Sequence, residues 1–123
     1  MANILLIDDD DMVRGTTRAM LEIGGHSVRE AENGAEGISQ YREVSPDMVI
    51  TDIVMPDMDG LETIQALFGI DPEVKILAIS GGGRMLDGAT YLSIASRFGA
   101  QTILNKPFLG KELLETVDNI LAS

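Results

Sequence analysis

Three short apolar runs in this sequence each lead into a charged group. The runs and the groups are Ile4–Ile7 before Asp8–Asp11, Met48–Ile50 before Asp52, and Ile103–Leu104 before Lys106. Apolar runs of this length without polar alternation are typical of parallel strands that are buried on both faces. In an open parallel sheet, ligands bind at the carboxyl ends of the strands. We therefore expect the three charged groups at one edge of one sheet.

Strand and helix patterns alternate along the whole chain, which indicates a (βα)₅ arrangement. The expected strands cover Asn3–Ile7, His26–Ala31, Asp47–Thr51, Val74–Ile79 and Gln101–Leu104, and the expected helices cover Asp11–Ile23, Ala35–Val44, Gly60–Phe68, Thr90–Phe98 and Gly110–Leu121. Strands that are apolar on both faces need helices on both sides of the sheet. Right-handed crossovers then favour a doubly wound α/β sandwich of three layers, with a parallel five-stranded sheet in the flavodoxin-like order 2-1-3-4-5. Its switch point lies between the first and third strands.

The composition narrows the possible functions. A chain of 123 residues fits one domain, and the last expected helix nearly exhausts it, so we expect one domain over 1–123 and no output domain. A net charge of −11 disfavours direct nucleic-acid binding, and the lack of cysteine excludes disulfides and thiol chemistry. We expect no signal peptide and no membrane insertion, hence a cytoplasmic location.

Some residues have simple structural interpretations. Aspartates at a helix start often act only as caps, which is one interpretation of Asp8–Asp11. The helix over 11–23 carries apolar residues at mixed helical spacing, and we expect Gly24-Gly25 to end it. These apolar residues are Met12, Ala19, Met20 and Ile23. We expect His26 on an exposed strand, without a chemical role.

Considered together, three carboxylates and an ammonium at one sheet edge indicate a divalent-metal site with a phosphoryl acceptor in it. The chain resembles the receiver domain of the response regulators of bacterial two-component signalling, over essentially its whole length. The motifs that carry the resemblance are Leu6-Ile7-Asp8-Asp9-Asp10, Thr51-Asp52-Ile53-Val54-Met55-Pro56-Asp57-Met58-Asp59-Gly60, Ile79-Ser80-Gly81 and Lys106-Pro107-Phe108.

The resemblance implies that Asp52 is the phosphoacceptor, which takes a phosphoryl group from a sensor histidine kinase or a histidine phosphotransfer protein. It implies Asp9 as a direct ligand of Mg²⁺ (or Mn²⁺), with Asp8 acting partly through water and the backbone carbonyl of Val54 as a further ligand. Mg²⁺ suits such a site because it takes few carboxylates and shares phosphate oxygens.

The resemblance also assigns two residues to the phosphoryl group itself. Lys106 would pair with it as a point charge, and the Ser80 hydroxyl would move to bond a phosphoryl oxygen. By the same likeness, the bond before Pro107 is a candidate for the cis form, and Asp57–Gly60 forms the turn into the third helix. The implied protein is not an enzyme beyond its own phosphorylation and dephosphorylation.

Three features depart from the family pattern. Ile103 replaces the Tyr or Phe that many receivers carry three residues before the lysine. The loop after Ser80 is glycine-rich, with Gly81-Gly82-Gly83 and Gly88, and we expect residues 81–90 to be mobile until phosphorylation orders them. Val54 and Gly82 occupy positions that tune water attack, and neither side chain can bond a water, so we expect slow loss of the phosphoryl group.

The sequence thus predicts a stand-alone response regulator that switches protein–protein interactions in a phosphorelay, either by binding an unidentified downstream target or by passing phosphate on. Two alternatives stay open. One is a small aspartyl-phosphate phosphohydrolase of the haloacid-dehalogenase kind, with Asp57-Met58-Asp59-Gly60 as its Asp-x-Asp motif, and the other is a scaffold receiver that takes no phosphate. The family's usual partner face would include Tyr91, Ile94, Arg97, Gln101, Ile103 and Lys111.

Overall fold

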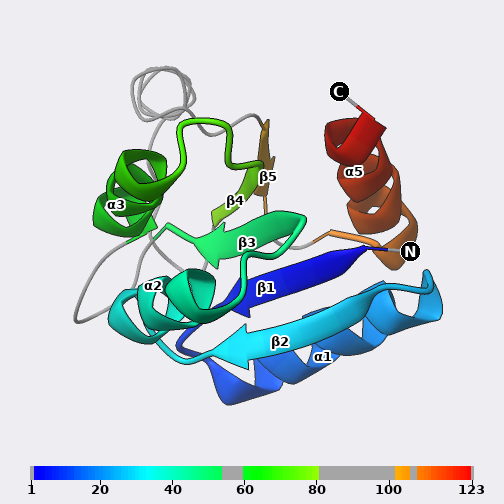
Figure 1. Cartoon of the computed structure of the whole chain (residues 1–123). Helices are drawn as coiled ribbons and strands as arrows, with labels where there is room; N and C mark the ends of the chain where they lie inside the picture. The colour runs from blue at the N-terminus through cyan, green and yellow to red at the C-terminus, as the bar shows by residue number, and fades with distance from the viewer. Residues whose placement is uncertain (1, 54–59, 81–101, 106–107, 123) are drawn as a thin grey trace.

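The computed structural model describes residues 2–53, 60–80, 102–105 and 108–122 (Figure 1). Strands and helices alternate from β1 to β4, and β5 and α5 follow. Their bounds are β1 Asn3–Ile7, α1 Asp11–Ile23, β2 Ser27–Ala31, α2 Gly34–Glu43, β3 Met48–Asp52, α3 Gly60–Ile70, β4 Ile76–Ser80, β5 Thr102–Asn105 and α5 Gly110–Ala122. The helix expected over Thr90–Phe98 lies outside the described residues.

The five strands form one parallel sheet in the order β2-β1-β3-β4-β5, which confirms the predicted topology. The chain leaves β1, adds β2 on one side of it, and then crosses to place β3 on the other side. β1 and β3 are therefore neighbours at the switch point, and their register pairs Ile7 with Thr51. This register brings the residues that follow β1 beside the end of β3.

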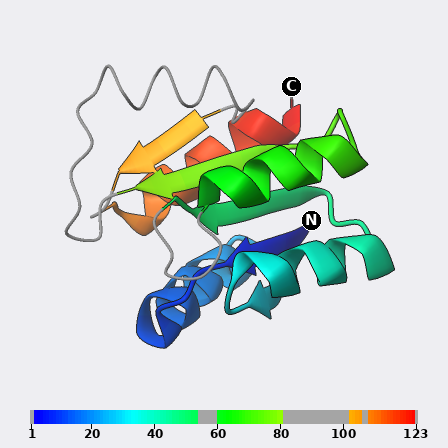
Figure 2. The ribbon, with the colours of Figure 1, turned by 90° about the vertical axis from the view of Figure 1, so that its left-hand side faces the viewer.

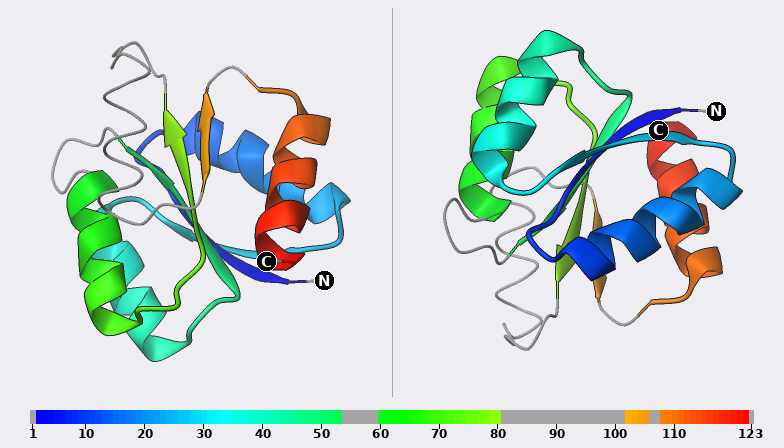
Figure 3. Two further views of the ribbon diagram at one scale, coloured as in Figure 1. Left: turned by 90° about the horizontal axis from the view of Figure 1, so that it is seen from above. Right: turned by 90° about the horizontal axis from the view of Figure 1, so that it is seen from below.

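Helices cover both faces of the sheet, as the apolar strands required. The pair α2 and α3 lies in front of the strands in Figure 2, and both views in Figure 3 place α1 and α5 together on the opposite face. Between α1, α5 and the sheet lies one buried cluster, which includes Leu21, Leu113 and Val117. The cluster on the other face includes Tyr41, Ile64 and Leu67.

The buried stripe of α1 differs from the apolar pattern in its sequence. Met12 and Ile23 are 84% and 83% exposed, whereas the buried residues of the helix are Arg14, Thr17 and Leu21. Arg14 can be buried because its guanidinium finds charged and carbonyl partners there in place of water. The helix ends as expected, since Gly25 adopts a φ of 89°, a conformation that glycine tolerates readily.

The prediction of an exposed His26 was wrong. The residue is only 9% exposed and lies just before β2, where its Nδ1 accepts a hydrogen bond from the Ala2 backbone N–H at 3.2 Å. Because the pairing of β1 with β2 begins at Asn3 and Ser27, the Ala2 N–H lies beyond the ladder and needs another acceptor. The imidazole supplies it.

None of the helices in the described part of the chain combines the length and the apolar character that crossing a membrane requires.

The packing of α5 gives a matched pair of leucines for testing this core. Leu113 is fully buried, while Leu109, one turn earlier, is 76% exposed. We expect Leu113→Ala to lower the free energy of unfolding by about 2–5 kcal/mol, because it leaves a cavity between α5 and the sheet. Leu109→Ala should change it by less than about 0.5 kcal/mol. Urea unfolding of both variants checks this, and equal losses would contradict the placement of α5.

Candidate functional site

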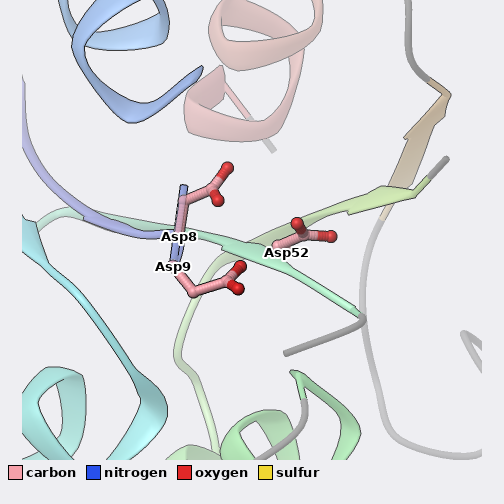
Figure 4. Close-up of side chains that lie close together, drawn as sticks. All are labelled: Asp8, Asp9 and Asp52. Carbon is pink, nitrogen blue, oxygen red and sulfur yellow. The ribbon is translucent and has the colours of Figure 1, made fainter. Parts of the chain in front are cut away.

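Three aspartates meet at the carboxyl edge of the sheet. Asp8 and Asp9 directly follow β1, and Asp52 is the last residue of β3. One carboxylate oxygen from each lies within 4.8 Å of those from the other two. Figure 4 shows the three side chains lying close together at the ends of the two strands. Asp8 and Asp52 are only 3% and 8% exposed, whereas Asp9 is exposed, so the cluster is accessible from the side of Asp9.

The donor set of this cluster suits a hard divalent cation. Carboxylate oxygens are ligands that Mg²⁺ prefers, and oxygens in one octahedral Mg²⁺ shell lie about 3–4 Å apart. The observed spread within 4.8 Å is close to that range, so small side-chain adjustments would suffice. Carboxylates this close repel one another, and a bound cation relieves that repulsion. The residues that are present therefore fit the metal predicted from the sequence.

The run of four aspartates divides between two tasks. Asp10 is the N-cap of α1, and its Oδ1 accepts hydrogen bonds from the backbone N–H groups of Met12 and Val13 at 3.0 and 3.1 Å. Asp11 lies in the first turn, where its Oδ1 accepts a hydrogen bond from Arg14 at 2.6 Å. The capping interpretation thus holds for the second half of the run, which leaves Asp8 and Asp9 to the cluster.

The loop that carries Asp8 and Asp9 is held on several sides. The Asp8 backbone N–H donates to the Ala31 carbonyl at 3.1 Å, which extends the β1–β2 ladder by one residue. The Asp10 backbone N–H donates to Asp8 Oδ1 at 2.9 Å, and Arg14 Nη1 donates to the Asp8 carbonyl at 2.7 Å. Fixed backbone groups on both sides of Asp9 leave its exposed side chain as the freer part of the loop.

Arg14 connects this loop to α1 and β2. Besides the Asp8 carbonyl, its guanidinium donates to Asp11 and, through Nε, to Glu30 Oε1 at 2.9 Å. Burial works against the charge, but the hydrogen bonds to Asp11 and Glu30 outweigh it and raise the pKa of Arg14. The sequence interpretation assigned no role to Arg14 or Glu30. The sequence did offer one indication of the burial of Arg14, because Arg14, Thr17 and Leu21 have the i, i+3, i+7 spacing of one helix face.

Glu30 is shared by two arginines of α1. Arg18 Nη1 donates to Glu30 Oε2 at 2.7 Å, while Arg14 uses the other oxygen. The hydrogen bond from Arg18, with that from Arg14, lowers the pKa of Glu30 despite the opposing effect of burial. Arg18 also pairs with Glu22 at 3.4 Å. Only Arg14 of the two arginines donates to the Asp8 carbonyl.

The other predicted site residues are described in part. Ser80 is the last residue of β4 and is paired in register with Asn105, the residue before Lys106. The Ile53 backbone N–H donates to the Ile79 carbonyl at 3.0 Å, which places the backbone of Ser80 at the same edge as Asp52. Val54, Lys106 and the 57–59 segment lie outside the described residues.

The structure also describes only some of the residues that depart from the family pattern and only part of the proposed partner face. Ile103 is a partly buried residue that packs against the cluster beneath α2 and α3. Lys111 is an exposed residue of α5. The glycine-rich segment and the rest of that face fall in 81–101, and Pro107 also lies outside the described part of the chain.

Comparison with known proteins gives a consistent picture. The model of the response regulator receiver domain family matches residues 4–118. The chemotaxis protein CheY of Bacillus subtilis is 34% identical over 119 residues, which cover 96% of each chain. Protein PilH of Pseudomonas aeruginosa is 36% identical over 122 residues, which cover 99% of each chain. The match extends over nearly the full length of both relatives.

Solved structures show the same architecture. The chemotaxis protein CheY4 of Vibrio cholerae superposes with a TM-score of 0.89 at 26% identity, covering 98% of each chain. A receiver domain protein from Clostridium thermocellum gives 0.88 at 29% identity, covering 99% of this chain and 95% of its own. Because the family model matches most of the chain and two relatives exceed 30% identity over nearly their full length, the chain belongs to the response regulator receiver domain family.

Proposed function

We propose that this chain is a response regulator that accepts a phosphoryl group on Asp52. The observation that carries the proposal is the aspartate cluster at the switch point, in a chain of the receiver family. In the transfer, an Asp52 carboxylate oxygen forms a bond to phosphorus as the bond from phosphorus to the donor nitrogen breaks. The histidine side chain of the kinase or phosphotransfer protein leaves and takes up a proton.

The residues at this edge of the sheet would have different roles in the reaction. Asp9, Asp8, Asp52 and the backbone carbonyl of Val54 would hold Mg²⁺ (or Mn²⁺), as receiver domains typically do through acidic residues. When bound, the metal supplies positive charge to the phosphoryl oxygens. Lys106 would contribute a further positive charge, and the Ser80 hydroxyl would donate a hydrogen bond to the transferred group. Asp52, as the buried nucleophile, depends on these groups because a carboxylate alone attacks phosphorus poorly.

The consequence of phosphorylation would be a change in protein–protein interactions. CheY and PilH are matched over 96% and 99% of their lengths, which supports the proposal that this chain acts as a receiver in the manner of these relatives. The net charge of −11 supports a protein partner rather than a nucleic acid. The chain would act either on a downstream target or as an intermediate that passes phosphate to a phosphotransfer protein.

The first test is phosphorylation by a small-molecule donor. After incubation with acetyl phosphate and Mg²⁺, we expect the intact mass to increase by one phosphoryl group, and EDTA should prevent this. Asp52→Asn should abolish it, because the amide keeps the shape of the side chain but is not nucleophilic. An unmodified wild-type protein, tested also with histidine kinases, would support the scaffold alternative, whereas turnover of p-nitrophenyl phosphate would support the phosphohydrolase.

A second prediction concerns the repulsion within the cluster. Asp9→Asn should raise the free energy of unfolding in EDTA by up to about 1 kcal/mol, because it removes one of three mutually repelling carboxylates. The same variant should lose most of the stabilisation that Mg²⁺ gives the wild-type protein. Thermal unfolding with and without Mg²⁺ measures both effects. If Mg²⁺ does not change the melting temperature of the wild-type protein, this would argue against a metal site.

A third prediction concerns the lifetime of the phosphoryl group. Because the side chains of Val54 and Gly82 cannot bond a water, we expect the phosphorylated form to persist far longer than a few seconds without a phosphatase. Val54→Asn should shorten the lifetime, since it adds an amide while keeping the backbone carbonyl. Mass spectrometry at intervals after removal of the donor gives the decay. A wild-type lifetime of only seconds would contradict this.

A further inference from the structure

We infer that Arg14 is a positioning residue for the metal site, because it fixes the peptide that joins Asp8 to Asp9. The inference rests on the proposed function. The carbonyl oxygen that receives Arg14 Nη1 at 2.7 Å belongs to Asp8, and the N–H of the same peptide unit belongs to Asp9. Because a peptide unit is planar, one hydrogen bond to its oxygen restrains the orientation of the whole unit. That orientation sets the direction in which the Asp9 side chain leaves the loop.

The restraint is rigid because Arg14 is itself held from three directions. Nη1 bonds the loop after β1, Nη2 bonds Asp11 of α1, and Nε bonds Glu30 of β2. A guanidinium presents these donors in a fixed planar fork, so the three partners are held in one mutual arrangement. Its side chain is only 10% exposed, which shields these bonds from water. A lysine ammonium, which is a single point charge, does not reproduce this fork.

The geometric role of Arg14 and its charge predict opposite effects of its removal on Mg²⁺ binding. A cation near a divalent-metal site weakens metal binding by repulsion, so removal of the Arg14 charge alone would tighten it. Loss of Arg14 would also leave the carboxylates at 2.6 and 2.9 Å without this partner, which adds to the tightening expected from charge. If Arg14 acts through geometry, as we infer, its loss should instead weaken Mg²⁺ binding. The direction of the change distinguishes the two accounts.

Arg18 provides a matched control. It is an arginine of the same helix, bonds the same Glu30, and gives no hydrogen bond to the Asp8 carbonyl. Arg14→Met and Arg18→Met each remove one positive charge and keep most of the aliphatic stem. Arg14→Lys keeps the charge but loses the fork, because an ammonium cannot reach three partners in a fixed plane.

The experiment is a calorimetric titration of MgCl₂ into the full chain and each variant, with circular dichroism to verify folding. We expect Arg14→Met to raise the Kd for Mg²⁺ about tenfold, as is usual when a group behind a metal ligand is lost. Arg14→Lys should recover only part of that loss, and Arg18→Met should stay within about twofold of wild type. With acetyl phosphate, the half-saturating Mg²⁺ concentration for Arg14→Met should rise in parallel, while the rate at saturating Mg²⁺ recovers.

Several outcomes would overturn the inference. If Arg14→Met binds Mg²⁺ as well as or better than wild type, Arg14 supports only stability or acts only by charge. If Arg14→Lys binds like wild type, the fork is unnecessary. A variant that does not fold leaves the decision to Arg14→Lys, which retains the charge. In all of these cases the wild-type protein still binds Mg²⁺, whereas a wild-type protein that neither binds Mg²⁺ nor takes phosphate would refute the proposed function itself.

Discussion

The pairing of β1 with β3 is the constraint on which the candidate site depends. These strands are separated in sequence by β2 and two helices, yet they are neighbours because the chain reverses its direction of winding between them. Their register pairs Ile7 with Thr51, so the next residues, Asp8 and Asp52, meet where both strands end. A shift of this register by one residue would exchange the faces of every side chain and separate the carboxylates. The buried apolar residues of both strands oppose such a shift.

Gathering acidic groups at this edge has an electrostatic cost, and the structure offsets part of it locally. Asp10 is stabilised by the backbone N–H groups at the start of α1, which suits a negative charge. Arg14 pairs with both Asp11 and Glu30, and Arg18 also pairs with Glu30. The three carboxylates of the cluster lie within 4.8 Å of one another, so their repulsion favours a bound cation. A cluster whose repulsion is relieved by a bound cation is well suited to respond to that cation.

Much of the fold and of the candidate site could be predicted from local patterns. The apolar run Ile4–Ile7 and the aspartates after it are contiguous in sequence, so the strand, its end and the position of Asp8 at the edge follow together. The roles of the two halves of Asp8–Asp11 could not be separated in this way, because capping and metal binding select the same residue type. Only the hydrogen bonds of Asp10 and the convergence of Asp8 and Asp9 on Asp52 separate them.

The sequence by itself determined the order of strands and helices, the doubly wound topology and the edge at which Asp8, Asp9 and Asp52 meet, because each depends on short apolar runs and on the handedness of crossovers. The tertiary structure alone decided that Arg14 and His26 are buried. Both are polar residues whose burial depends on backbone groups elsewhere in the chain, the Asp8 carbonyl and the Ala2 N–H, which need partners. Hydrophobic periodicity cannot reveal which backbone groups will need a side-chain partner, since that need arises only when separate segments are packed together.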